Sequence, residues 1–487
     1  MAKGKGSSRS PQARHGKSSP ASRHDKRARL LHRNAKRRRT KFAKVPLTGS
    51  IARLAGQMAG LLDARHGFRL PIVFAGAMLA GSRRTASRWF RAAGVADDWD
   101  RFYDLLRSIG KHTESLMMPI LMLLVKQFDP GPNGRWKIVM DDSPTKRYGR
   151  HVEAANVHHH PTPGPADGPW LYGHNWVCLA ILMKHSMWGV LALPILSKLY
   201  VRRVDIGKLK ARYSWEFHTK HELALQLIRQ VTGCIRALGS DAGFVVVADG
   251  AYAIRNFLWP LVKDGIHVVS RLRRDAQLFD LPVNRVGQRG RPRKYGKNRI
   301  SLAKRAGRRD GWQSVTFFCR GIEITRRYKS FLATTRLTSG VVRVVILEHE
   351  SGNWATYFSS DVEMEVTAIL ETVSERWAIE EHFHDVKEVW GAGQQQVRNV
   401  WSSIGCWHLN TWLYTMVELE CWDLPASKIV DRRDRSWDNP CRRPSHADRR
   451  RKIMRQMLEK QFLTDLPKGT NARKYKQRIV QLLNLAA

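Results

Sequence analysis

The chain of 487 residues has few cysteines, half as many acidic as basic residues, and no long apolar run. Its six cysteines are scattered without a CxxC pair, which argues against a disulfide framework or a structural zinc site. The longest apolar run, Leu116 to Val125, is ten residues long and contains Pro119, whereas a membrane span needs about 20. The charged N-terminus lacks the apolar segment of a secretory signal. We therefore expect a protein without a membrane span, in a reducing, cytoplasmic compartment.

The basic residues are concentrated in three segments. The chain has 84 Lys and Arg against 42 Asp and Glu, a net charge of +42. Residues 1–44, 271–310 and 432–487 hold 16, 14 and 16 of these cations but only one, three and five acids. A nearly neutral body with three basic segments predicts a polyanionic partner, namely nucleic acid, and hence association with the nucleoid. A solubilising surface would need less charge.

The middle of the chain has the pattern of a mixed α/β fold. Three strands come first, over 136–141, 175–183 and 189–200. Helices over 215–238 and 253–264 then alternate with strands over 244–249 and 266–271. Only strands follow within 314–358, and helix returns over 362–390. This order predicts a mixed sheet with helices on both faces and a β-rich insertion.

A helical region precedes these strands. An apolar segment, 70–81, is followed by Ser82, a possible helix cap, and by a segment with Arg83, Arg84 and Arg88. This pattern is typical of a helix-turn-helix, in which the three arginines would contact DNA. An ordinary helical hairpin explains the pattern as well.

Carboxylates stand at three positions suited to chemistry. Asp141 and Asp142 close the first strand, and Asp249 closes a strand of four apolar residues. On the helix over 362–390, Ile379, Phe383, Val386 and Trp390 form a buried stripe. A second line on this helix carries Arg376, Glu380 and Lys387. Strand-end Asp residues often cap turns, and such a line can be a surface ion-pair ladder. Together, in a basic protein, they favour a two-metal phosphoryl-transfer site.

These residues resemble the DDE transposases of bacterial insertion sequences, specifically the subgroup with a Tyr-x2-Arg-x3-Glu-x6-Lys helix. The matching segments are Asp141-Asp142-Ser143 with Lys146 and Gly149, Tyr172-Gly173-His174, Ala248-Asp249, and the helix of Arg376, Glu380 and Lys387. Segments 290–296, 358–361 and 443–445 also match. The resemblance implies a ribonuclease H-like catalytic core that cleaves transposon ends and transfers strands into target DNA.

The resemblance also implies the residue roles. Asp141, Asp249 and Glu380 would hold two Mg²⁺ ions, for which Mn²⁺ would substitute, with Asp142 and Glu381 as rivals. Arg376 and Lys387 would hold phosphates of the transposon end. The subgroup has Tyr three residues before the Arg, where this chain has Val373, so we expect that phosphate contact to be missing.

The resemblance further suggests a division of the chain and a synaptic homodimer on double-stranded DNA in a prokaryote. The expected regions are a disordered basic arm (1–44), a helical DNA-binding region (45–130), the first part of the core (131–275), a basic loop and β insertion (276–360), the second part of the core (361–420) and a basic helical region (421–487).

Three other segments have less certain roles. Arg289, Arg291, Arg293 and Lys294 form an extended basic strip that fits either an A·T-rich minor groove or phosphates anywhere. The histidines at 158–160 lack companion ligands and predict an exposed loop. Cys406 and His408 predict helical core packing.

Two other functions compete with that of a transposase. A non-enzymatic architectural DNA-binding protein would explain the basic segments but leave the acids unexplained. A nuclease of the same fold would cut DNA without joining it.

Overall fold

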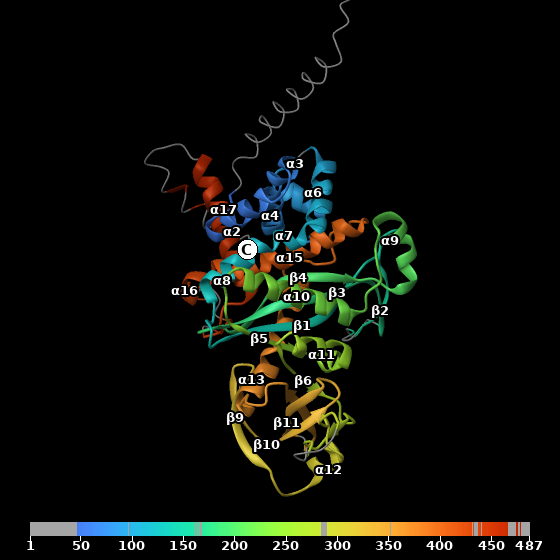
Figure 1. Cartoon of the computed structure of the whole chain (residues 1–487). Coiled ribbons are helices and arrows are strands. Elements are labelled where there is room, and N and C mark those ends of the chain that lie inside the picture. Colours follow the sequence, from blue (N-terminus) through green and yellow to red (C-terminus); the bar gives the residue numbers. More distant parts are fainter. Residues whose placement is uncertain are drawn as a thin grey trace, which may run out of the picture. The chain divides into compact units, whose positions relative to one another are not determined.

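One mixed sheet of twelve strands organises the part of the chain that the computed structural model describes (Figure 1). The structure describes residues 46–465, apart from 96, 161–162, 164, 166–167, 284–289, 351, 431, 433–436 and 440, together with 474, 475 and 478. These residues belong to one compact unit, Pro46–Ala487. The expected basic arm and Arg289 lie outside the described residues. No described helix is both long and apolar enough to pass through a bilayer.

The strand order places two parallel pairs at the centre of the sheet. The order is β2-β3-β1-β5-β6-β12-β11-β10-β7-β8, with β4 paired to β3 and β9 to β10. β1 and β6 both pair with β5 in parallel, and the other pairs are antiparallel. The strands are β1 (Arg135–Lys146), β2 (Asn156–His159), β3 (Trp170–His185), β4 (Gly189–Tyr200), β5 (Gly243–Ala248), β6 (His267–Leu272), β7 (Leu278–Phe279), β8 (Arg299–Ile300), β9 (Gln313–Cys319), β10 (Ile322–Thr335), β11 (Gly340–Glu348) and β12 (Trp354–Ser359). The predicted mixed α/β architecture is confirmed.

Helices pack around this sheet. Those that precede β1 in the sequence, α2 to α8, form a helical region of their own. They are α2 (Gly49–Gly60), α3 (Ala64–Gly67), α4 (Leu70–Leu79), α5 (Ala86–Ala92), α6 (Trp99–Lys111), α7 (Thr113–Leu116), α8 (Met118–Phe128), α9 (Ile206–Tyr213), α10 (Lys220–Ala237), α11 (Arg255–Lys263), α12 (Leu302–Gly307), α13 (Val366–Glu375), α14 (Trp377–Glu388), α15 (Val400–Glu420), α16 (Ala426–Ile429) and α17 (His446–Asp465).

Helix α15 joins the N-terminal helices to the sheet. It packs against α2, α4 and α6 and also against β4 (Figure 1). A helix that is buried on all sides needs residues on every face that are apolar or whose polar groups are hydrogen-bonded. Cys406 and His408 are both fully buried on α15, as predicted. Gly110 on α6 faces the carbonyl of Trp401, and Gly405 on α15 faces the carbonyl of Leu106. Because glycine has no side chain at these two positions, α6 and α15 can pack closely.

The β-rich insertion continues the core sheet. β12 pairs with β6, and β11 and β10 follow in order. Helix α13 covers this part of the sheet, where Ile369 and Leu370 pack with Val269, Val345 and residues of β9. Val373 packs against the same cluster, so the residue at the family's Tyr position contributes to core packing in this chain.

Several predicted details are wrong. The helix expected over 362–390 is two helices, because α13 ends and α14 begins at Arg376. Thr85, which accepts a hydrogen bond from the backbone N–H of Arg88, caps α5 instead of Ser82. The exposed loop expected around His158 is partly strand β2, where this residue is buried. Pairing with β3 makes this segment a strand, and the ring of His158 lies against the ring of Tyr200 on β4.

Candidate active site

Two of the predicted acids lie next to each other where a parallel ladder ends. The last pair between β1 and β5 is Met140 with Ala248, so Asp141 and Asp249 follow on adjacent strands. Asp141 does not end its strand as predicted, because β1 continues to Lys146 through its pairing with β3. The position is nevertheless the carboxyl edge of the parallel strands, where ligand sites of α/β sheets gather.

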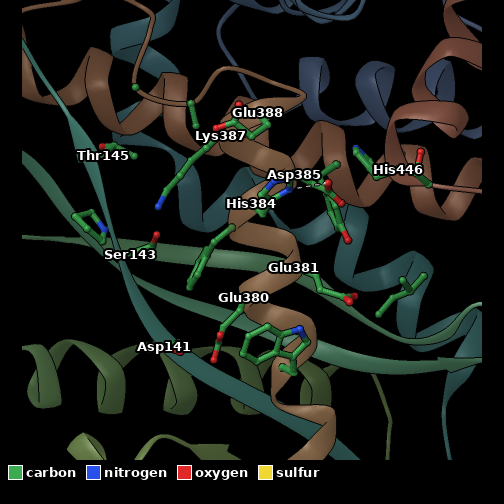
Figure 2. A pocket seen from close by; sticks show the side chains of 18 of the residues that line it. Asp141, Ser143, Thr145, Glu380, Glu381, His384, Asp385, Lys387, Glu388 and His446 are labelled. Atoms are coloured by element: carbon green, nitrogen blue, oxygen red, sulfur yellow. Dashed lines mark ion pairs between the residues drawn. The ribbon is translucent and has the colours of Figure 1, made fainter. Parts of the chain in front are cut away.

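Helix α14 brings the third acid to the same place. Ile379, Phe383, Val386 and Trp390 are buried as predicted. The second line of the helix, with Arg376, Glu380 and Lys387, lines the cavity at the sheet edge. Figure 2 shows Glu380 extending from α14 toward Asp141. The same helix directs Lys387 toward β1, near Ser143 (Figure 2). The spacing inferred from the sequence therefore corresponds to one functional face.

Arg376 connects two of these acids. Its Nη1 atom donates to Oδ2 of Asp141 at 2.8 Å, and its Nη2 atom donates to Oε1 of Glu380 at 2.5 Å. Burial alone would lower the pKa of Arg376, but Asp141 and Glu380 outweigh it and raise that pKa. The guanidinium therefore stays charged and holds the two carboxylates on either side of itself.

Asp141 has the most perturbed carboxyl group of the site. Burial raises its pKa to about 7, and Arg376 only partly opposes this effect. The charges of Asp142 and Asp249 raise the pKa further. A single guanidinium thus leaves excess negative charge at the sheet edge, and a strongly perturbed buried carboxyl in a cavity is characteristic of functional sites.

The acids line one cavity of about 1270 Å³. Its walls come from β1, the end of β5, α14, the loop after α14, and residues that precede or begin α17. Its lining includes Asp141, Asp142, Tyr148, Asp249, Arg376, Glu380, Glu381, Lys387, Gly393, Gln394, Arg442, Arg443, Ser445, His446 and Arg449. Burial lowers the pKa of Lys387, whose ammonium shares the cavity. The cavity thus combines carboxylates with cations able to bind phosphate.

The two rival acids have partners of their own. Asp142, on the other side of β1, accepts a hydrogen bond from Nζ of Lys220 on α10 at 2.6 Å. Glu381 lies 3.5 Å from Nη2 of Arg443. Both line the cavity, but neither contacts Arg376 as Asp141 and Glu380 do. The geometry therefore favours Asp141 and Glu380 over their neighbours.

The carboxylates of Asp141, Asp249 and Glu380 are of a kind that suits a divalent cation, although Arg376 lies between Asp141 and Glu380. Asp and Glu oxygens are the ligands that Mg²⁺ prefers. Within the described ranges, no three His, Cys, Asp or Glu side chains are close enough together to share a metal ion. Arg376 lies between the carboxylates of Asp141 and Glu380. A metal ion shared by these two acids would have to displace this guanidinium.

The wall that precedes α17 was not predicted as part of the site. Arg443 contacts the carbonyl of Trp188 and Glu381. His446 Nδ1 bonds the buried carboxylate of Glu418, and Nε1 of Trp390 donates to its Nε2 atom at 2.7 Å. The matching segment 443–445 was the only sequence evidence for this wall. Ser445, whose Oγ atom accepts a hydrogen bond from the backbone N–H of Asp448, caps α17 at this wall.

The other predicted DNA-binding residues are dispersed. Arg83 and Arg84 line a smaller cavity next to the first, whereas Arg88 donates to Ser82 on the helical region. Arg291, Arg293 and Lys294 are exposed residues between β7 and β8 and do not line the acidic cavity. The structure therefore brings Arg83 and Arg84 near the acids.

Comparison with known proteins gives a family for the central part of the chain. The model of the transposase DDE domain matches residues 219–416, which include Asp249 and Glu380 but not Asp141. No curated protein matches the sequence. Among solved structures, a chain of the "piggyBac transposase synaptic complex with hairpin DNA" is 8% identical with a TM-score of 0.37. That alignment covers 91% of this chain and 84% of the other.

The domain match is consistent with the geometry, since its two acids meet Asp141 at one cavity. Enzymes of this kind bind DNA and use divalent metal ions. Residues 219–416 thus carry a transposase DDE domain, and this match supports activity as a DNA transposase, an enzyme of the nuclease and phosphoryl-transfer class.

Proposed function

We propose that the chain cleaves DNA at the ends of a bacterial insertion sequence and joins those ends to target DNA, with Asp141, Asp249 and Glu380 as the catalytic carboxylates. The observation that carries this proposal is that three acids from β1, the end of β5 and α14 line one cavity. Nothing in helix capping or surface ion pairing requires acids from such distant segments to converge.

Two Mg²⁺ ions would be held by these three carboxylates, and Mn²⁺ would substitute. When bound, such ions make a water or a DNA 3′-hydroxyl a better nucleophile and stabilise the leaving oxygen. The protein's own contribution is the set of acids at the sheet edge and the cations around them. Once Arg376 leaves Asp141 and Glu380, it can bind a phosphate together with Lys387.

The basic regions would hold the DNA. In this proposal the helical region 45–130 and the β insertion over 276–360 contact the duplex through Arg83, Arg84, Arg88, Arg291, Arg293 and Lys294, and the arm over 1–44 and Arg289 add further contacts. Two copies would hold two transposon ends in a synaptic homodimer. The Tyr-x2-Arg-x3-Glu-x6-Lys subgroup is supported by Arg376, Glu380 and Lys387, whereas Val373 departs from it.

The test uses DNA duplexes that carry the element's own terminal inverted repeats, a target plasmid and Mg²⁺. The wild-type protein is expected to cut at the repeat end and then to form joined products. Asp249→Asn is expected to lose both products while retaining DNA binding, because it removes a metal ligand but no phosphate contact. The matched control is Asp104→Asn, an exposed acid paired with Arg107 on α6.

Each outcome has a distinct meaning. Cleavage without joining would identify a nuclease of the same fold, and binding without either product would identify an architectural protein. Normal cleavage by Asp249→Asn would refute the assignment of the carboxylates.

A further inference from the structure

Tyr148 is a large aromatic residue left in solvent beside the acidic cavity. Its exposed fraction is 85%. Within the described part of the chain, its side chain makes no hydrogen bond and no ring contact. Exposed aromatic side chains of this size add nothing to the core, and their flat faces are suited to stacking with nucleobases. Tyr148 therefore requires an explanation other than stability.

This tyrosine stands where two cavities meet. It lines the large cavity that contains the acids and also a second cavity of about 470 Å³. Gly393 and Gln394 are likewise shared by both cavities. A volume of 470 Å³ lies within the range of about 300–1,000 Å³ that small-molecule sites occupy. The second cavity can hold a nucleotide but not a duplex.

The second cavity has the chemistry of a nucleotide site. Its other walls are Ser82, Arg83, Arg84 and Gln396, so it contains two cations and no acid. The amide groups of Gln394 and Gln396 can both donate to and accept from the edge of a base. The arginines supply positive charge for a phosphate.

Hydrogen bonds hold the walls of this cavity together. The backbone N–H of Arg84 donates to Oε1 of Gln394 at 2.9 Å, and Gln395 Nε2 donates to the carbonyl of Arg84 at 3.2 Å. On the other side, Nη1 of Arg147 donates to the carbonyl of Gly393 at 3.2 Å. Three separate chain segments are thus fixed around the exposed ring before any ligand arrives.

We propose that Tyr148 stacks with an unpaired base of the DNA end, and that Arg83 binds the adjoining phosphate in the second cavity. This inference rests on the proposed function, because it assumes that the acids of the first cavity act on DNA. An unpaired base next to the reacting phosphate occupies the second cavity. Tyr148 thereby fixes the position of the phosphate relative to Asp141 and Glu380.

The experiment compares two DNA probes in the presence of a chelator, so that no cleavage occurs. One is a blunt duplex, and the other is the same duplex with a single-stranded extension that contains 2-aminopurine. Base stacking on an aromatic side chain tolerates any sequence, so the terminal repeat need not be known. The proteins are full-length wild type, Tyr148→Ala, Tyr148→Phe and a control, Trp259→Ala, an exposed aromatic on α11 that lines neither cavity.

Tyr148→Ala is expected to bind the extended probe about tenfold more weakly than wild type and to leave blunt-duplex binding unchanged. It is also expected to lose the quenching of 2-aminopurine that stacking produces. Tyr148→Phe is expected to retain both, because it keeps the ring, and Trp259→Ala is expected to behave as wild type.

Equal binding of the extended probe by Tyr148→Ala and wild type would overturn the inference. So would an equal loss on both probes, since it would indicate a general contact. Because the assay does not depend on cleavage, a wild-type protein that never cuts would refute the proposed function separately.

Discussion

Arg376 and Asp141 form an ion pair, 2.8 Å from nitrogen to oxygen, inside the acidic cavity. The same guanidinium also pairs with Glu380. An arginine that neutralises two carboxylates competes with any metal ion for them. If these carboxylates hold metal ions as proposed, the free protein is expected to have a low metal affinity, and DNA phosphates that attract Arg376 are expected to favour metal binding.

Arg376→Gln is expected to bind Mn²⁺ about tenfold more tightly than wild type in the absence of DNA. Hydrogen bonds to charged groups contribute about 1.5–3 kcal/mol, and about 1.4 kcal/mol corresponds to tenfold in affinity. Calorimetric titration with Mn²⁺ measures the change. Lys137→Gln is the control, since Lys137 pairs with Glu375 outside the cavity. Weaker Mn²⁺ binding by Arg376→Gln would show that the guanidinium does not compete.

His408 is expected to make the protein less stable in acid. Burial lowers its pKa to about 4, and its Nε2 atom accepts a hydrogen bond from the backbone N–H of Ser197. In the unfolded chain its pKa is about 6.5. Unfolded molecules therefore take up this proton first, and the stability falls as the pH drops from about 6.5 to about 4, by about 1.4 kcal/mol per pH unit.

His408→Gln is expected to make this acid dependence less steep by that amount. The measurement is the free energy of unfolding in urea between about pH 7 and about pH 5. The exposed His384→Gln serves as the comparison and is expected to leave the slope unchanged. An unaltered slope for His408→Gln would mean that its imidazole is protonated in the folded state.

Two glycines of similar helical context are expected to respond oppositely to alanine. A Cβ at Gly405 would lie 2.1 Å from the carbonyl oxygen of Leu106, whereas a Cβ at Gly56 on α2 would meet nothing within 4 Å. Gly405→Ala is expected to destabilise the protein by about 1–3 kcal/mol through overpacking. Gly56→Ala is expected to stabilise it by about 0.4–1 kcal/mol. Thermal denaturation distinguishes the two, and a stabilised Gly405→Ala would rule out the close helix crossing.

Much of the arrangement at the sheet edge could be predicted from local patterns. The apolar runs that lead to Asp141 and Asp249 follow from the alternation of strand and helix, and the position of Glu380 follows from the spacing of its helix. The ladder between β1 and β5 then makes these acids neighbours. Such inferences succeed because strand direction and helical periodicity are set by residues close in sequence.

Other features depend on contacts between distant segments and could not be predicted. The helix break at Arg376 has no Gly or Pro to mark it, and β1 extends past Asp142 only because β3 pairs with it. The wall formed by Arg443 and His446 depends on Glu418 and Trp390, which are far away in sequence. Tyr148 stands out only once its exposed fraction is known.

The wall that precedes α17 also sets the order in which the site is completed during translation. The ribosome makes Asp141 early, but it adds Arg443, His446 and Arg449 only after Asp249 and Glu380 have been made. A nascent chain, or one shortened by a premature stop codon before Arg443, has all three acids and lacks one side of their cavity.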